Sequence, residues 1–234
     1  MNAICLSFGL MLRLIRQDMM PLAAMIGPVL AGMAMRFGWP LLEGVLARLT
    51  GQMNVLSPYG GLADIFLASL APALYGFAAG MVVLEEHDDR IDRYLFVTGL
   101  GKTGYLASRA VLPAGFSFAM TAALLSLFGL SGLSAAQIVL LSLAGALQGI
   151  MVALVIVVFA SNKLEGMAAA KLASLLMLGA AAPFFLPAPL NLCLSFLPSF
   201  WMGKAALGES GMLPCFLAGG GWIVILLGRY RRRL

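Results

Sequence analysis

The sequence predicts an all-α integral membrane protein with six transmembrane helices, an N-terminal interfacial helix and an outer re-entrant segment between spans five and six. Composition gives the first reason. Of 234 residues, 62% are hydrophobic and 11% are charged, and the mean hydropathy is +0.98. Soluble domains carry about 25% charged residues. The apolar residues also gather in runs of the length that crosses a bilayer, about 20 residues.

Residues 1–18 are expected to form a helix lying in the membrane surface. Apolar side chains share one helical face, with Arg13 and Gln17 opposite them. A signal peptide is not expected, because the basic residues follow the apolar stretch and no small-residue cleavage site appears. Residues 19–234 are predicted to form a single six-span domain.

Six apolar segments account for the predicted spans. They lie near residues 19–37, 61–84, 110–130, 135–160, 167–186 and 212–228. With the N-terminus inside, only Arg36, Arg48 and Lys204 of the fifteen Lys and Arg residues fall on the outer side. Since basic residues concentrate in cytoplasmic loops, both termini are predicted to be cytoplasmic, in a bacterial-type plasma (inner) membrane.

Two outer segments are longer than simple turns. In residues 38–60, the stretch LLEGVLARL could form a short helix on the outer surface. Residues 187–211 are too apolar for a free loop and too rich in proline for a span. A re-entrant or interfacial pair of helices fits them best, since irregular backbone at membrane depth needs protein around it. Pro198 and Trp201 in this segment are the predicted outer gate.

One charged loop, residues 85–109, lies between the second and third spans of this hydrophobic sequence. It holds half of the acidic residues, so it must face water and is the obvious place for a soluble partner to dock. At helical spacing it presents an apolar face made of Ile91, Tyr94, Leu95 and Thr98. A charged rim is expected from Asp88, Asp89, Asp92 and Arg93.

Enzymatic readings of this loop are weaker. Asp88, Asp89 and Asp92 form a DDxxD pattern, which in membrane prenyltransferases holds magnesium and a diphosphate. That chemistry usually needs a second acidic cluster, and the other acids are scattered, so a solvated charged helix is favoured and a transferase is the lesser alternative. The stretch GLGKTG is not an ATP-binding loop, because Phe96 stands where that motif needs glycine.

Other candidate sites are single residues. Asp64 is the one acid placed to serve a proton-coupled secondary carrier, the main alternative function. His87 is best read as a solvated surface histidine, and the three cysteines have no metal-ligand spacing. No catalytic, cofactor-binding or metal residue is therefore expected. Nucleic acid is not an expected partner, because the basic residues lie at span ends rather than on one face.

Several stretches resemble the permease subunit of type-2 ATP-binding cassette exporters. LEEHDD after the second span, followed by TGLGKTGYLASRAVLP, is similar to that family's loop into the third span. Gly99 replaces the usual proline there, and His87 replaces the usual lysine or arginine. SNKLEGMAAAKL, FLPSFW and PLAAMIGPVLAGMAMRFG resemble further family segments. Within the family the likeness is nearest to small permeases of drug or fluoroquinolone export.

The resemblance implies a transport subunit rather than an enzyme. It would move a hydrophobic or amphipathic compound (a drug, lipid-like molecule or peptide) outward, using ATP hydrolysed by a separate subunit. Two copies of that ATPase, or a related pair, would bind ATP and magnesium, and this chain would hold no cofactor. A second permease copy or a related permease would complete the pore among the membrane lipids. The implied coupling residues are Glu85, Glu86, Asp88, Asp89, Ile91, Asp92, Tyr94, Leu95, Thr98 and Tyr105.

Overall fold

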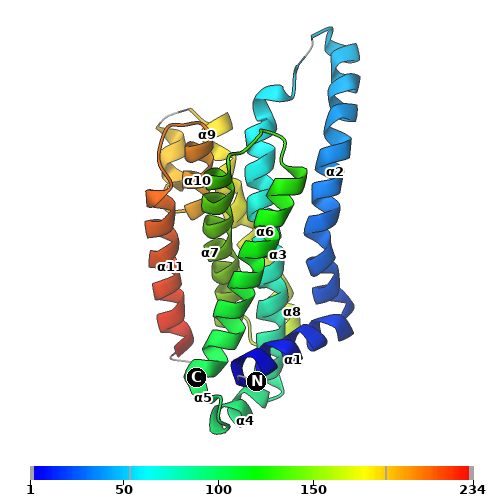
Figure 1. Cartoon of the computed structure of the whole chain (residues 1–234). Helices are drawn as coiled ribbons and strands as arrows, with labels where there is room; N and C mark the ends of the chain where they lie inside the picture. The colour runs from blue at the N-terminus through cyan, green and yellow to red at the C-terminus, as the bar shows by residue number, and fades with distance from the viewer. Residues whose placement is uncertain (1–2, 53, 188, 232–234) are drawn as a thin grey trace.

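The computed structural model describes residues 3–52, 54–187 and 189–231, and all regular structure within these ranges is helical, as predicted (Figure 1). The α-helices are α1 (Ala3–Gln17), α2 (Met19–Thr50), α3 (Gly60–Asp88), α4 (Ile91–Val97), α5 (Gly101–Leu106), α6 (Leu112–Phe128), α7 (Ala135–Phe159), α8 (Lys163–Ser174), α9 (Ala182–Phe185), α10 (Pro198–Ala206) and α11 (Leu213–Arg231). Short helices of other types are η1 (Ser57–Tyr59), the π-helical η2 (Ala107–Val111), η3 (Leu175–Ala180) and η4 (Leu190–Leu194).

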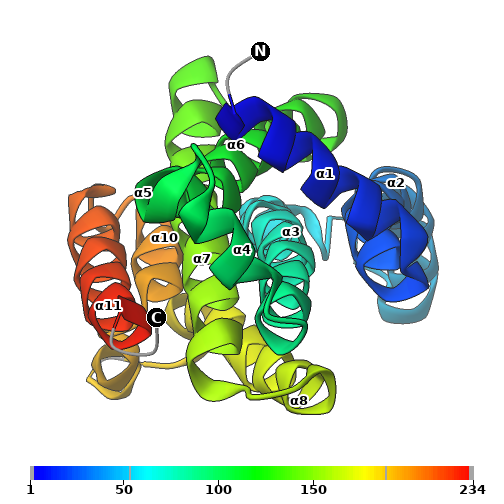
Figure 2. The ribbon, with the colours of Figure 1, turned by 90° about the horizontal axis from the view of Figure 1, so that it is seen from below.

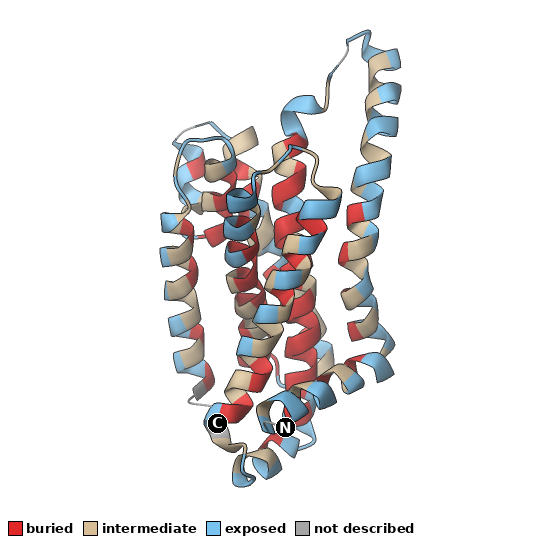
Figure 3. Cartoon of the chain, in the orientation of Figure 1, coloured by how far each residue is buried: buried red, intermediate tan, exposed pale blue. Residues whose placement is uncertain are grey.

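Helices α3 and α7 form the centre of the bundle, with α2, α6, α8 and α11 around them (Figure 2). Glycine makes their close contact possible. A Cβ atom on Gly76 would lie 2.1 Å from the carbonyl oxygen of Gly149, and one on Gly145 would lie 2.4 Å from that of Ala68. Small residues let membrane helices approach in this way. The two central helices are accordingly the most buried, while α2 is largely exposed (Figure 3).

Within the described residues, five helical stretches are long and apolar enough to cross a membrane. These are Met19–Thr50, Ser57–Asp88, Thr103–Phe128, Ala135–Phe159 and Leu213–Tyr230. The sixth predicted span, residues 167–186, is not one continuous helix, so the count of six is not confirmed. Its α-helix ends at Ser174, η3 follows as a 3-10 helix, and α9 has only four residues.

Helix α10 packs closely on the broken segment after α8. The Ser199 hydroxyl of α10 donates to the carbonyl of Leu176 in η3. A Cβ atom on Gly179 would lie 2.5 Å from the Ser199 oxygen, so glycine is what lets α10 come this close. A 3-10 stretch of this length is uncommon and often marks a hinge. The apolar run alone could not reveal it.

Helix α2 is longer than the sequence suggested. The expectation of a separate surface helix within residues 38–60 was wrong, because LLEGVLARL continues α2 without a break. Its 32 residues extend about 48 Å at 1.5 Å per residue, well beyond a hydrocarbon core of about 30 Å. The helix ends only at Gly51, whose φ of 68° is the left-handed conformation typical of a helix C-terminus.

Helix α1 lies across the lower end of the bundle, beside α4 and α5 (Figures 1 and 2). Ser7, Met11 and Ile15, spaced one turn apart, are buried against the bundle, while Leu6 and Leu10 are exposed. Asp18 separates α1 from α2: its carboxylate accepts the amide of Met20 and caps α2. The chain therefore turns sharply from the end of the bundle into a long helix.

Candidate functional site

A buried polar network occupies the lower end of the bundle, where α3 approaches the start of α6. The Arg109 side chain donates from Nε to Glu86 Oε2 at 2.8 Å and from Nη2 to Glu86 Oε1 at 2.5 Å. The Tyr105 hydroxyl also donates to Oε2, at 3.0 Å. Glu86 is 2% exposed and Arg109 6%. Two charges removed from water in this way are tolerated only when they are paired and hydrogen-bonded, and the bidentate geometry meets that condition.

The same arginine also holds α1. Its third nitrogen, Nη1, donates to the carbonyl oxygen of Ser7 at 2.9 Å. The hydroxyls of Ser7 and Ser108 lie 3.3 Å apart and share a hydrogen bond. Both Ser108 and Arg109 belong to the π-helical turn η2 and both are buried. We call Glu86, Tyr105, Arg109 and Ser7 the α1–α3–α6 clamp; it joins the surface helix to two helices of the bundle.

A second contact fixes the turn between α3 and α4. His87 Nδ1 and Asp92 Oδ2 lie 2.8 Å apart, and Asp92 Oδ1 accepts the amide of Arg93 at 2.7 Å. Arg90, between them, has a left-handed φ of 59°. Asp92 is buried, so it stabilises the turn and does not belong to a charged rim.

The exposed face of α4 is apolar. Ile91, Tyr94 and Val97 follow one another at a spacing of three residues and are 39%, 73% and 86% exposed. Leu95 is half-buried, and Phe96 packs edge-on against the Tyr105 ring, with the ring centres 5.2 Å apart. We call Ile91, Tyr94 and Val97 the α4 stripe. Exposed apolar residues gathered on one short helix make it a candidate interaction surface.

The structure places the predicted coupling residues in three groups. Six are exposed: Glu85, Asp88, Asp89, Ile91, Tyr94 and Thr98. Leu95 is half-buried, and Glu86, Asp92 and Tyr105 are buried in the contacts above. Val97 was not among the predicted coupling residues. The helical spacing used for that prediction ran on to Thr98 and so passed over Val97. The helix instead ends at Val97, and Thr98 is extended.

Asp64 has a structural role in this fold. It is fully buried at the upper end of α3, and its two carboxylate oxygens accept the amides of Leu130 and Ser131 at 2.8 and 2.9 Å. The Ser131 hydroxyl donates to it as well. These bonds fix the turn that joins α6 to α7, a use for the carboxylate other than proton transfer.

Metal binding finds no support in the described part of the chain. No group of three or more His, Cys, Asp and Glu side chains there could hold an ion. In the DDxxD stretch, Asp88 and Asp89 are exposed while Asp92 turns inward to His87. The three carboxylates therefore do not converge on one point.

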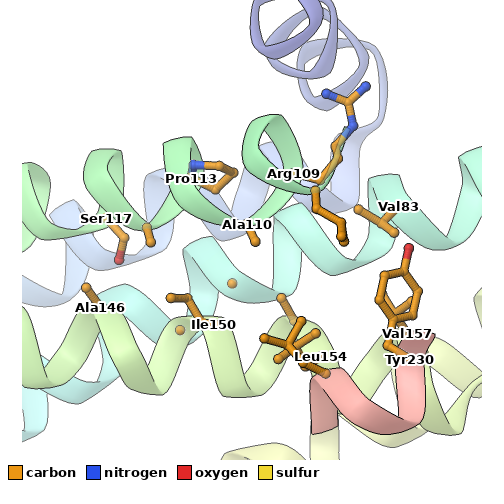
Figure 4. Close-up of a pocket in the computed structure, with 16 residues that line it drawn as sticks. Val83, Arg109, Ala110, Pro113, Ser117, Ala146, Ile150, Leu154, Val157 and Tyr230 are labelled. Carbon is orange, nitrogen blue, oxygen red and sulfur yellow. The ribbon is translucent and has the colours of Figure 1, made fainter. Parts of the chain in front are cut away.

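Beside the clamp, a narrow apolar cavity of about 50 Å³ lies between α3, α6, α7 and α11. Figure 4 shows the Arg109 guanidinium turned away from it, so that only the aliphatic stem lines the wall. Tyr230 of α11 closes the same end, and Ser117 lies farther along α6. Tyr230 also interacts with Tyr105 of the clamp, so the lower end of α11 reaches the clamp at this end of the cavity.

The comparison with known families decides the assignment. Residues 11–230 match the family model described as "Fluoroquinolones export permease protein Rv2686c-like". The chain belongs to this family. The match covers Glu86, Tyr105 and Arg109 of the clamp but not Ser7, and it includes the α4 stripe and the segment around Trp201.

Two relatives in this export-permease family are both from Mycobacterium tuberculosis. They are the fluoroquinolones export permease proteins MT2760 of strain CDC 1551 / Oshkosh and Rv2686c of strain ATCC 25618 / H37Rv. Each is 25% identical over 209 residues, which is 87% of this chain and 82% of the relative. No solved structure matches. Family membership and the apolar helices make the chain a multi-pass membrane permease with a role in export.

Proposed function

We propose that the chain is the membrane-spanning subunit of an ATP-driven exporter, powered by a separate ATP-binding subunit that docks on α4. The observation that carries this proposal is the α4 stripe. A tyrosine and a valine that are 73% and 86% exposed stand on a seven-residue helix between two membrane helices. A helix this short has little stability by itself. A partner that covers the apolar stripe would remove its side chains from water and stabilise the helix.

The expected partner is a pair of ATPase subunits, which would bind ATP and magnesium. The charged residues around the stripe suit the rim of such an interface: Glu85, Asp88, Asp89, Arg90 and Arg93 are all exposed. Interfaces typically combine an apolar centre with a polar rim. A second permease copy, or a related permease, would complete the translocation path.

Force transfer follows from the clamp. When ATP closes the ATPase pair, α4 is displaced, and the buried Glu86–Arg109 pair carries the displacement to α3, α6 and α1 together. A rigid, fully bonded pair transmits motion that a flexible loop would absorb. For the coupling to work, the ATPase must bind α4 differently in its open and closed states.

The substrate is expected to be hydrophobic or amphipathic. The relatives carry fluoroquinolone export in their names, so a fluoroquinolone is the first compound to test. The geometry supports neither alternative function. For the proton-coupled carrier, Asp64 is already bonded to the turn between α6 and α7. For the membrane transferase, the carboxylates of the DDxxD pattern point in different directions.

The arrangement in the membrane is also part of the proposal. Residues 1–18 would lie in the inner membrane surface and residues 19–234 would form one domain. The broken segment from α8 through α9 would serve as the fifth of six spans. Residues 187–211 would form the re-entrant segment, with Pro198 and Trp201 as the outer gate. In support, Trp201 is anchored there through its indole nitrogen, which donates to the Ser195 carbonyl at 2.8 Å.

Cysteine labelling tests this topology. In a variant lacking Cys5, Cys193 and Cys215, a new cysteine at Leu133 or Gly208 should react with a membrane-impermeant maleimide on intact cells. One at His87 should react only after permeabilisation, because both termini and α4 are expected to be cytoplasmic. Reaction at His87 from outside would contradict the arrangement.

Affinity purification tests the function itself. When the tagged chain is extracted from its native membranes in mild detergent, an ATP-hydrolysing subunit should purify with it. Purification without any such subunit, under conditions that keep the permease folded and export-competent, would argue against the proposal.

A further inference from the structure

A groove opens at the upper end of the bundle, between α2, α3 and the segment from η3 to α9. Its volume is about 620 Å³, within the range of roughly 300–1,000 Å³ typical of pockets for drug-sized ligands. We call it the upper groove. Its walls include Met35 and Trp39 of α2, Tyr59 of η1, Phe66 and Ser69 of α3, and Phe185 of the broken segment.

Aromatic rings dominate the walls. Tyr59 and Phe185, from opposite sides, lie parallel with ring centres 6.1 Å apart and planes 9° apart. Trp39 and Phe66 add two further rings from α2 and α3. Three of the four side chains, Tyr59, Phe66 and Phe185, are 38%, 50% and 63% exposed. These exposed aromatic side chains offer ring surface to a flat molecule, since aromatic groups pair in offset-parallel or edge-on geometry.

The groove carries no charged side chain: its lining has neither Asp, Glu, Lys, Arg nor His. A ligand with net charge would lose hydration there without gaining a counter-charge, which is costly. The polar side-chain groups in the lining are neutral: the Trp39 indole N–H, the Tyr59 hydroxyl and the Ser69 hydroxyl. Ser69 is fully buried, and its hydroxyl donates to the Met202 sulfur at 3.9 Å.

We propose that the upper groove binds a planar aromatic compound without net charge. The groove would be a substrate-binding site on the export path. This inference rests on the proposed export function and adds the location of a substrate-binding site. Leu62, Phe66 and Ser69 lie in the first three turns of α3, at the end of the bundle opposite α4. A site there is far from the ATPase and near the exit.

The aromatic walls favour this occupant over two others. A lipid acyl chain would fill the volume, but it gains nothing specific from two parallel rings. A second copy of the chain has another surface available, since Ile26, Leu30, Met33 and Phe37 are exposed on α2 outside the groove. Both occupants give distinct outcomes in the experiment.

The test is binding of acridone, an uncharged planar fluorophore, to the full chain in nanodiscs, measured by the fluorescence anisotropy of the compound near neutral pH. Saturable binding is expected. Phe66→Leu and Phe185→Leu should each weaken it about threefold to tenfold, because each removes one ring and keeps an apolar side chain. Phe37→Leu, on the exposed face of α2 outside the groove, is the matched control and should bind as the original chain does.

Three results would overturn the proposal. One is the absence of saturable binding, and another is equal binding by all three variants. The third is displacement of acridone by dodecanol as effectively as by a planar aromatic competitor, which would assign the groove to a linear chain. If Met35→Cys formed a rapid disulfide between copies that acridone did not slow, a second copy would be the occupant instead. No ATPase takes part, so failure here leaves the α4 interface to be judged by purification alone.

Discussion

Replacing Arg109 by alanine is expected to destabilise the folded chain by about 3–5 kcal/mol. The substitution leaves Glu86, which is 2% exposed, as a buried charge without its partner. It also removes the bond to the Ser7 carbonyl, so α1 should detach from the bundle. The measurement is the apparent unfolding temperature in detergent, together with the rate at which protease cuts the connection between α1 and α2.

Two comparisons make this result specific. Lys163→Ala removes a pair with Asp18 in which both side chains are partly exposed, and exposed pairs contribute about 1 kcal/mol or less. The double variant Glu86→Leu/Arg109→Met should recover much of the stability lost in Arg109→Ala, since well-packed apolar residues can replace a buried ion pair. If Arg109→Ala unfolded at the same temperature as Lys163→Ala, the clamp would not hold these helices together.

Replacing Tyr94 or Val97 by aspartate is expected to weaken binding of the ATPase subunit by about 2 kcal/mol or more, which is about thirtyfold. Each substitution puts a charge at the centre of the α4 stripe, where apolar contacts should supply most of the affinity. Because both side chains point away from the bundle, the fold itself should survive. The measurement is recovery of the ATPase with each tagged variant, beside the amount of permease in the membrane.

Asp89→Asn is the matched control on the rim of the same turn. Its side chain is exposed, and rim charges usually contribute little to affinity, so ATPase recovery should stay near that of the original chain. Leu95→Asp differs from both, since Leu95 is half-buried against the bundle and its loss should lower folding and docking together. Normal ATPase recovery with both Tyr94→Asp and Val97→Asp would remove α4 as the docking element.

The sequence predicted the features that depend on local pattern. Apolar runs predicted the five long helices that the described part of the chain has. The charged segment after α3 was correctly expected to be a distinct loop with a helix in it. In each case the signal lies within a stretch of about 20 residues.

Features that depend on distant contacts could not be predicted. The bond from Arg109 to the Ser7 carbonyl joins residues 102 positions apart, and the π-helical turn that buries Ser108 beside Arg109 has no recognisable sequence signal. The broken fifth apolar segment is bonded at Leu176 to Ser199, which lies 23 residues later in the chain. Glu86 and Asp92 looked like members of one solvated acidic run until tertiary contacts separated them from Glu85 and Asp89.

The central claim is that ATP hydrolysis in a separate subunit drives export through this chain. Its most direct test is transport in proteoliposomes that contain the permease either alone or with its copurified ATPase. The account predicts that ciprofloxacin moves only when both proteins and ATP are present, and that a protonophore does not stop it. Transport by the permease alone, driven by an imposed proton gradient, would contradict the account and assign the chain to the secondary carriers.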